Sequence, residues 1–154
     1  MQNEKSDIEK LLAEGHTVQI KPQGYSMYPM FIPGRDEAVI APVSPGEARR
    51  GDVVLYRRES GILVLHRVWK RKPDGLYMVG DNQTEIEGPL KETQIKGILR
   101  AFVRKGRYTE ATHPVYRAAS RIWLFLRPMR HPVMAAGAAA KKAACNLAGR
   151  IKRK

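Results

Sequence analysis

The sequence is poor in several residue types, and each shortage excludes a class of protein. A single cysteine, Cys145, excludes an internal disulfide and fits a reducing compartment. The longest unbroken apolar run, residues 122–126, is far shorter than the roughly 20 residues of a membrane-spanning helix. The N-terminal segment is polar and charged, unlike a secretory signal peptide. We therefore expect a cytoplasmic protein, or one attached peripherally to the cytosolic face of a membrane.

Acidic residues are absent from the C-terminal part of the chain. The formal net charge is +13, and residues 113–154 contain ten Lys or Arg but no Asp or Glu. Such a segment is attracted to anionic lipid headgroups or to nucleic-acid phosphates. Nucleic acid is the less favoured partner, because the segment lacks aromatic residues interleaved for base stacking. An anionic membrane surface is the partner that we expect for this tail.

The remaining patterns predict a mainly β fold with a short N-terminal helix and a basic helical C-terminal extension. Ser6 has capping-box spacing to Glu9, which predicts a helix over residues 7–14. From there to about residue 110, short β-prone runs alternate with turn residues. These runs are HTVQIKP, EAVIAPV, GDVVLYRR, ILVLHRVWK, LYMVG and IKGILRAFVRKG. We expect one main domain over residues 1–112, followed by a tail over residues 113–154.

The tail begins with a predicted amphipathic helix. Val115, Ala119, Ile122 and Leu126 have the spacing of one apolar helical face. A basic amphipathic helix of this kind lies in the headgroup region of a membrane, where we expect Trp123 to sit at the interface.

Two residues are candidates for nucleophilic catalysis. Ser26 lies in the turn-like stretch GYSMYP, and His66 lies within ILVLHRVWK, where period two places it with Val64 and Val68. A serine hydroxyl is a weak nucleophile until a base removes its proton, and a neutral imidazole suits that role. A turn serine and a core histidine are the ordinary alternatives, because Gly, Ser and Pro favour turns for backbone reasons.

Four short motifs in order favour catalysis. G-x-S-M-x-P at residues 24–29, Gly-Asp-Val-Val at 51–54, His-Arg-Val at 66–68 and Gly-Asp-Asn at 80–82 together resemble the type I signal peptidase family. The resemblance covers roughly residues 15–105. It is closest to the histidine-base type, found in the endoplasmic reticulum, archaea and some spore formers, because His66 stands where the housekeeping bacterial enzymes have lysine.

The resemblance implies a serine endopeptidase that cleaves an extended, signal- or leader-like peptide with small residues before the cut. Ser26 is then the nucleophile, and His66 is the general base and later the general acid. Asp81 is the first choice for the orienting carboxylate, with Glu85 or Glu87 as the alternative. The Ser26 N–H is expected to bind the oxyanion. A second donor that some relatives have is missing, because Gly24 occupies its position.

Supporting roles follow from the same resemblance. Met27 and Pro29 are expected to shape the nucleophile turn and to line the substrate cleft. Gly51 and Asp52 are expected to start a strand, and Arg67 is a candidate to pair with a carboxylate. No cofactor and no metal ion are implied.

The sequence also departs from the family. Typical signal peptidases have a transmembrane helix just before the serine motif, whereas this chain has a charged helix of about two turns there. A different function is a catalytically inactive or self-cleaving regulatory domain, since self-cleaving repressors share the superfamily. No helix-turn-helix precedes the β region, and those repressors use a lysine base, so we favour the peptidase.

Overall fold

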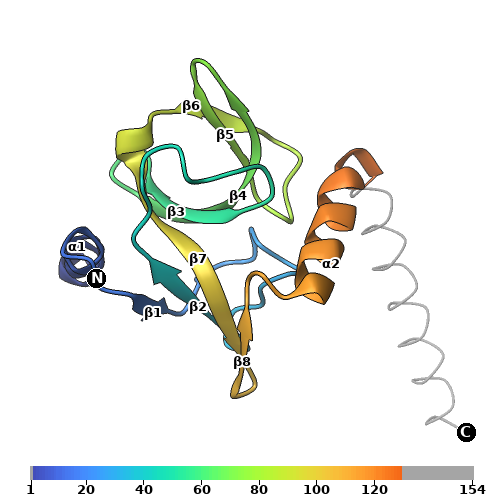
Figure 1. The fold of residues 1–154 in the computed structure, drawn as a ribbon, viewed down its shortest axis with the longest axis horizontal. Helices are drawn as coiled ribbons and strands as arrows, with labels where there is room; N and C mark the ends of the chain where they lie inside the picture. Colours follow the sequence, from blue (N-terminus) through green and yellow to red (C-terminus); the bar gives the residue numbers. More distant parts are fainter. Residues whose placement is uncertain (1, 130–154) are drawn as a thin grey trace, which may run out of the picture.

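Eight strands form one antiparallel sheet, which confirms the mainly β prediction (Figure 1). The computed structural model describes residues 2–129, so the predicted tail from residue 130 onward lies outside the described residues. The strands are β1 (Val18–Ile20), β2 (Asp36–Ala41), β3 (Val53–Arg57), β4 (Leu63–Lys72), β5 (Gly75–Val79), β6 (Glu87–Leu90), β7 (Ile95–Arg104) and β8 (Arg107–Glu110). Their order in the sheet is β1-β2-β7-β3-β4-β5-β6, and β8 also pairs with β7.

Each of the six predicted β-prone runs contains a strand, whereas β6 and β8 were not predicted. β6 includes Gly88 and Pro89, which are both unfavourable in strands, and Pro89 has no N–H to donate. β8 is four residues long and its sequence, RYTE, shows no apolar alternation. Pairing with β5 and β7, respectively, overrides these weak local preferences.

Two helices flank the sheet. α1 (Gln2–Ala13) and α2 (Pro114–Phe125) lie on opposite sides of the molecule (Figure 1). Two 3-10 turns complete the elements of residues 2–129, η1 (Glu92–Gln94) and η2 (Arg127–Met129). The predicted helix start was wrong: α1 begins at Gln2, so Ser6 lies inside the helix. The residues before Ser6 include Gln, Glu and Lys, which are good helix formers and extend the helix upstream.

The two faces of the sheet bury separate apolar clusters, because successive side chains on a strand point to opposite faces. Val53 and Leu55 of β3 pack in one cluster with Leu12 of α1 and with Met27 and Phe31 of the segment between β1 and β2. The alternate residues of β3 pack in the other cluster; its members include Val54, Tyr56, Val68, Leu76 and Met78. The segment that contains Ser26 is therefore fixed to the first cluster.

α2 packs against the domain through one face, which corrects the expected position of Trp123. The Trp123 Nε1–H donates to the Asp81 carbonyl oxygen at 2.8 Å, and the Tyr116 ring centroid lies 4.9 Å from that of Phe102. Leu124 is buried in the same contact. The prediction took Trp123 for an interfacial residue because a helical wheel does not reveal which face the domain covers. Among the described residues, no helix has the length and apolarity needed to cross a membrane.

Candidate active site

Ser26 lies in the nucleophile loop, which we define as residues 21–35 between β1 and β2. Met27 and Phe31 anchor this loop in the core, where they are 3% and 1% exposed. The Phe31 N–H donates to the Met27 carbonyl oxygen at 2.8 Å, and the Phe31 ring packs edge-on against Phe102. Anchoring by these neighbours leaves Ser26 half-buried at a fixed position.

The predicted turn at Asp81 and Asn82 holds the nucleophile loop from the other side. The Asn82 N–H donates to the Ser26 carbonyl oxygen at 2.8 Å. A Cβ at Gly80 would lie only 2.7 Å from that same oxygen, so Gly80 permits the close approach of the two segments. Two motifs that are more than fifty residues apart in the sequence therefore meet at the backbone of Ser26.

His66 is buried in the middle of β4, with 2% of its surface exposed. β3 and β4 form the predicted hairpin, in which Val54 pairs with His66 and Tyr56 pairs with Val64. Because side chains alternate along both strands, Tyr56 and His66 lie on the same face as diagonal neighbours.

Tyr56 connects His66 to a carboxylate. The Tyr56 hydroxyl donates to Glu87 Oε2 at 2.9 Å and lies 3.1 Å from His66 Nδ1. Arg58 donates to both oxygens of Glu87, each at 2.6 Å. Since the single Tyr56 proton goes to Glu87, the phenol oxygen can only accept from His66, which assigns the imidazole proton to Nδ1 and leaves Nε2 with a free lone pair.

Burial controls the ionisation of this group of residues. Desolvation lowers the pKa of His66 from 6.5 to about 4, partly opposed by the negative charge of Glu87, so the imidazole is neutral at pH 7. Burial opposes ionisation of Glu87 as well, but hydrogen bonds from Arg58 and Tyr56 outweigh it and lower the pKa of Glu87. Desolvation and the neighbouring Glu87 raise the pKa of Tyr56, which therefore stays protonated. A neutral base thus stands beside an ionised carboxylate, with a phenol between them.

Ser26 and His66 line the same cavity, which has a volume of about 420 Å³. The described residues show no hydrogen bond between the two side chains, and the Ser26 N–H has no acceptor there either. Serine and base pairs in free enzymes are often looser than in complexes with substrate. Met27 lines the cavity as expected. Pro29 instead lines a larger cavity of about 980 Å³ beyond the nucleophile loop, which contains neither Ser26 nor His66.

Asp81 contacts Arg67 rather than His66. Its two carboxylate oxygens accept from Arg67 at 2.8 and 2.7 Å, and both side chains are fully buried. Arg67 also donates to the Gly51 carbonyl oxygen at 2.7 Å. The charge of Asp81 raises the pKa of Arg67 despite the opposing effect of burial. The Arg67 and Asp81 pair, with its bond to Gly51, joins three of the four motifs. Arg67 therefore has the carboxylate partner that the sequence suggested, and Asp81 has Arg67 rather than His66 as its hydrogen-bond partner.

The two alternative carboxylates differ in position. Glu85 is exposed and forms no hydrogen bond or ion pair within the described residues. Glu87 is the carboxylate next to the histidine, with 4.0 Å between its Oε2 and His66 Nδ1. Sequence reasoning missed Tyr56 and Arg58. The hairpin register could have identified Tyr56, because the predicted three-residue loop, residues 59–61, already sets the Tyr56 and Val64 pair.

An unpaired strand edge borders the Ser26 and His66 cavity. Residues 63–66 of β4 pair with β3 on one side, but β5 begins to pair with β4 only at Arg67. On the opposite side of the cavity, β1 is the terminal strand of the sheet and leads through residues 21–24 to Ser26. The backbone groups of both edges are available to an extended peptide.

Comparison with known proteins assigns neither a family nor a function to the chain. The chain matches no model of a known protein family and no curated protein sequence.

Proposed function

We propose that this protein is a serine endopeptidase in which Ser26 is the nucleophile and His66 is the general base. The observation that carries the proposal is the shared cavity, whose lining includes both Ser26 and a buried neutral histidine with its Nδ1 next to the Tyr56 hydroxyl. A histidine that only fills the core would need neither a hydrogen-bonded Nδ1 nor a cavity shared with a half-buried serine. The unpaired edges around the same cavity support a peptide as the substrate.

In the proposed reaction, the His66 Nε2 lone pair takes the proton of the Ser26 hydroxyl as Oγ attacks the peptide carbonyl carbon. The carbonyl π electrons move to oxygen, and the Ser26 N–H stabilises the resulting oxyanion. The imidazolium then gives its proton to the amine nitrogen as the C–N bond breaks, which leaves an acyl-serine. Water, deprotonated by His66, releases the acid and restores Ser26.

In this proposal, Glu87 stabilises the imidazolium through Tyr56. The phenol takes the place of a direct hydrogen bond between the histidine and a carboxylate. The hydrogen bond from Nδ1–H to the phenol oxygen fixes the ring tautomer, and the charge of Glu87 lies 4.0 Å from Nδ1. Asp81, our first choice from the sequence, serves instead to hold the Asn82 turn against the nucleophile loop through Arg67.

The proposed substrate is an extended peptide or protein segment with small residues before the cut. Apolar side chains from β1, β4 and the nucleophile loop line the cavity on both sides of Ser26; they include Ile20, Met27, Leu63 and Leu65. A strand added between β1 and β4 places alternate side chains into this cavity. Leader or signal-like peptides have this extended, apolar character.

The proposal is tested by digestion of a complex peptide mixture with identification of new N-termini by mass spectrometry. Wild-type protein and Ser60→Ala, a control in the exposed β3–β4 loop, are expected to cut after small residues. Ser26→Ala is expected to give no cleavage. Equal cleavage by Ser26→Ala, or no cleavage by the folded wild-type protein with or without lipid, would contradict the proposal.

A further inference from the structure

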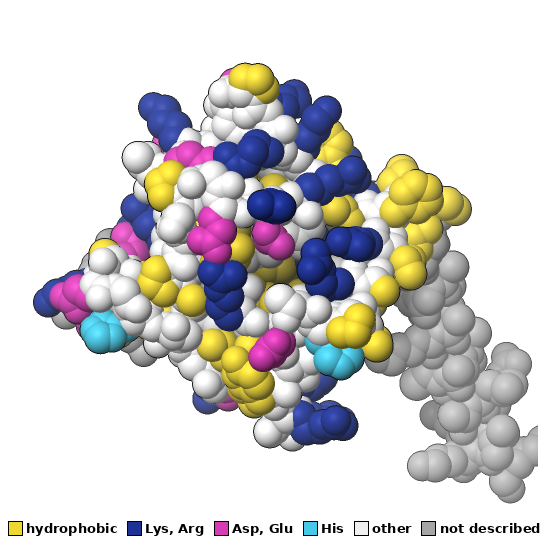
Figure 2. All heavy atoms as spheres, viewed as in Figure 1, with side chains coloured by type: hydrophobic (Ala, Val, Ile, Leu, Met, Phe, Trp, Pro, Cys, Tyr) yellow, Lys and Arg dark blue, Asp and Glu magenta, His cyan; other side chains and the backbone are white. Residues whose placement is uncertain are grey.

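α2 has a second apolar face, which the domain does not cover. Val115, Ile122 and Phe125 are 70%, 60% and 79% exposed, and Met129 of η2 is 54% exposed. At about 100° per residue, the three helical positions fall within roughly 80° of one another around the helix axis. Figure 2 shows hydrophobic side chains gathered along the side of the molecule where α2 lies. Single exposed apolar residues are ordinary, but three large ones on one helical face, with an exposed Met129 in the turn that follows, mark an interaction surface.

Basic side chains border this row. At about 100° per residue, Arg121 and Arg117 of α2 lie roughly 40° and 80° beyond Phe125 around the helix axis. Lys105 and Arg107 lie at the β7–β8 turn, across a groove from Val115. None of the four forms an ion pair with an acidic residue within the described part of the chain, whereas Arg57 and Arg100 do so elsewhere. Four cations without protein anions are available to an anionic partner.

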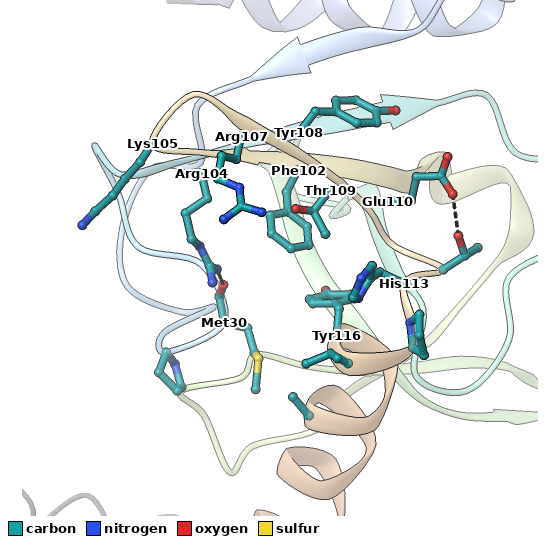
Figure 3. A pocket seen from close by; sticks show the side chains of 15 residues that line it. Met30, Phe102, Arg104, Lys105, Arg107, Tyr108, Thr109, Glu110, His113 and Tyr116 are labelled. Carbon is teal, nitrogen blue, oxygen red and sulfur yellow. Dashed lines mark hydrogen bonds between the residues drawn. The ribbon is translucent and has the colours of Figure 1, made fainter.

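The groove between the β7–β8 turn and the start of α2 has an apolar interior and a basic rim (Figure 3). Its volume is about 980 Å³, and the rings of Phe102 and Tyr116 lie inside it. Glu110, the acidic residue at its border, is engaged by the Thr112 hydroxyl at 3.0 Å. Arg104 forms an ion pair with Asp36, which Arg35 also contacts, so Lys105 and Arg107 are the rim cations without an acidic partner among the described residues.

We propose that this surface docks on an anionic phospholipid membrane, with the apolar row in the acyl-chain boundary and the four cations at the headgroups. We define the surface, which we call the α2 face, by Tyr108, Val115, Ile122, Phe125 and Met129 together with Lys105, Arg107, Arg117 and Arg121. An apolar helical row beside cations is the pattern of interfacial helices. Duplex or single-stranded nucleic acid fits it less well, because exposed Val, Ile and Met gain nothing from phosphates and do not stack on bases.

The α2 face differs from the membrane contact that the sequence predicted. Trp123 is not part of it, since its indole faces Asp81, and Tyr108 with the β7–β8 turn is added. The groove also includes Pro29 and Met30 of the nucleophile loop, so docking holds the Ser26 side of the domain near the lipid. The inference is independent of catalysis, because none of the residues that define the α2 face lines the Ser26 and His66 cavity.

The test is sedimentation of the full-length chain with vesicles of phosphatidylcholine alone or mixed with phosphatidylglycerol. We expect binding to the mixed vesicles and at least tenfold weaker partitioning for Ile122→Asp/Phe125→Asp and for Lys105→Glu/Arg107→Glu. Leu11→Asp introduces the same kind of change at one exposed apolar position outside the α2 face, and Lys70→Glu/Lys72→Glu matches the charge change of the basic variant; both should bind as the wild type.

Three outcomes would overturn the proposal. They are equal vesicle binding by both α2-face variants and the wild type, equal binding to neutral and anionic vesicles, and binding to a DNA duplex but not to vesicles. Circular dichroism of each variant confirms folding; the substituted apolar residues are at least 60% exposed, so their replacement removes no core contact. The Ser26→Ala protein should bind like the wild type, which separates this result from the fate of the peptidase proposal.

Discussion

The hydroxyl of Tyr56 lies 3.1 Å from Nδ1 of His66 and donates its proton to Glu87. This relationship decides which imidazole nitrogen carries hydrogen, and therefore which nitrogen is able to act as a base. Tyr56 is 0% exposed, so its hydroxyl makes these contacts inside the core, in addition to the packing of its ring.

Replacement of Tyr56 by Phe removes the acceptor for the His66 Nδ1–H while the ring still fills the core. We expect kcat to fall by about tenfold or more, less than the about 10²- to 10⁴-fold loss from removing the general base itself. The measurement is kcat and KM on a cleaved peptide, together with the pH profile. A merely structural tyrosine would change the melting temperature and leave kcat of the folded protein unaltered.

If His66 is the general base, as we propose, its burial sets the pH dependence of activity. The base must be neutral, and burial lowers the pKa of His66 to about 4, so kcat/KM should fall only as the pH drops through about 4. An ordinary histidine would already lose most of its activity at pH 5.5. A profile that is flat between pH 5.5 and 7.5 supports the assignment, whereas an acidic limb near pH 6.5 would show that the base is a solvated histidine.

The free energy of unfolding should also depend on the protonation of His66. The unfolded histidine binds a proton below about pH 6.5, whereas the folded one does so only below about 4. The unfolded state therefore binds more protons in this window, and the free energy of unfolding should decrease by about 3 kcal/mol between pH 6.5 and 4. Denaturant titrations of the wild type and His66→Gln at pH 7.5, 5.5 and 4.5 measure the difference, and identical pH dependence in the two proteins would contradict it.

The replacement of Asp81 by Asn separates the two candidate carboxylates. It leaves the buried Arg67 guanidinium without a counter-charge, which typically costs about 3–5 kcal/mol. We expect a large loss of stability but a retained kcat in the folded protein; the pKa of His66 should fall further, because the charge of Asp81 raises it. Glu87→Gln should instead alter kcat, because it removes the charge that stabilises the imidazolium. If Asp81→Asn abolished turnover in a protein of unchanged stability, Asp81 and not Glu87 would orient the base.

Gly80 provides a test of how the nucleophile loop is held. An alanine Cβ would lie 2.7 Å from the Ser26 carbonyl oxygen, so the loop must move away from the Asn82 turn. We expect Gly80→Ala to lower kcat/KM at least tenfold, because small displacements of reacting groups are costly. Ser60→Ala, in the exposed β3–β4 loop, is the control for a small substitution away from the site. Equal kcat/KM for the two variants would mean that the contact with Gly80 does not position Ser26.

Much of the fold could be predicted from local pattern, because β3, β4 and β7 have β-prone residues and clear turn signals. The strand β6 could not, since Gly88 and Pro89 oppose strand formation and only pairing with β5 creates it. This omission also concealed the approach of Glu87 to His66. The motifs predicted Ser26 and His66 as candidate site residues and a turn at Asn82, but the choice among Asp81, Glu85 and Glu87 depends on tertiary contacts that spacing does not contain.

The orientation of α2 was beyond the reach of the sequence for a similar reason. Its apolar residues form two faces, and the pattern predicts only that a face exists. Packing of Tyr116 on Phe102 decides which face the domain covers, and it leaves Ile122 and Phe125 in solvent.

The most direct test of the central claim is intact-mass analysis after treatment with a serine-reactive acylating probe. Wild-type protein and His16→Ala, a control at an exposed histidine, are expected to gain the mass of one probe. Ser26→Ala and His66→Ala are expected to gain none, because labelling needs both the hydroxyl and the base. Labelling of Ser26→Ala, or no labelling of the folded wild-type protein with and without anionic lipid, would contradict an activated serine and favour an inactive interaction domain.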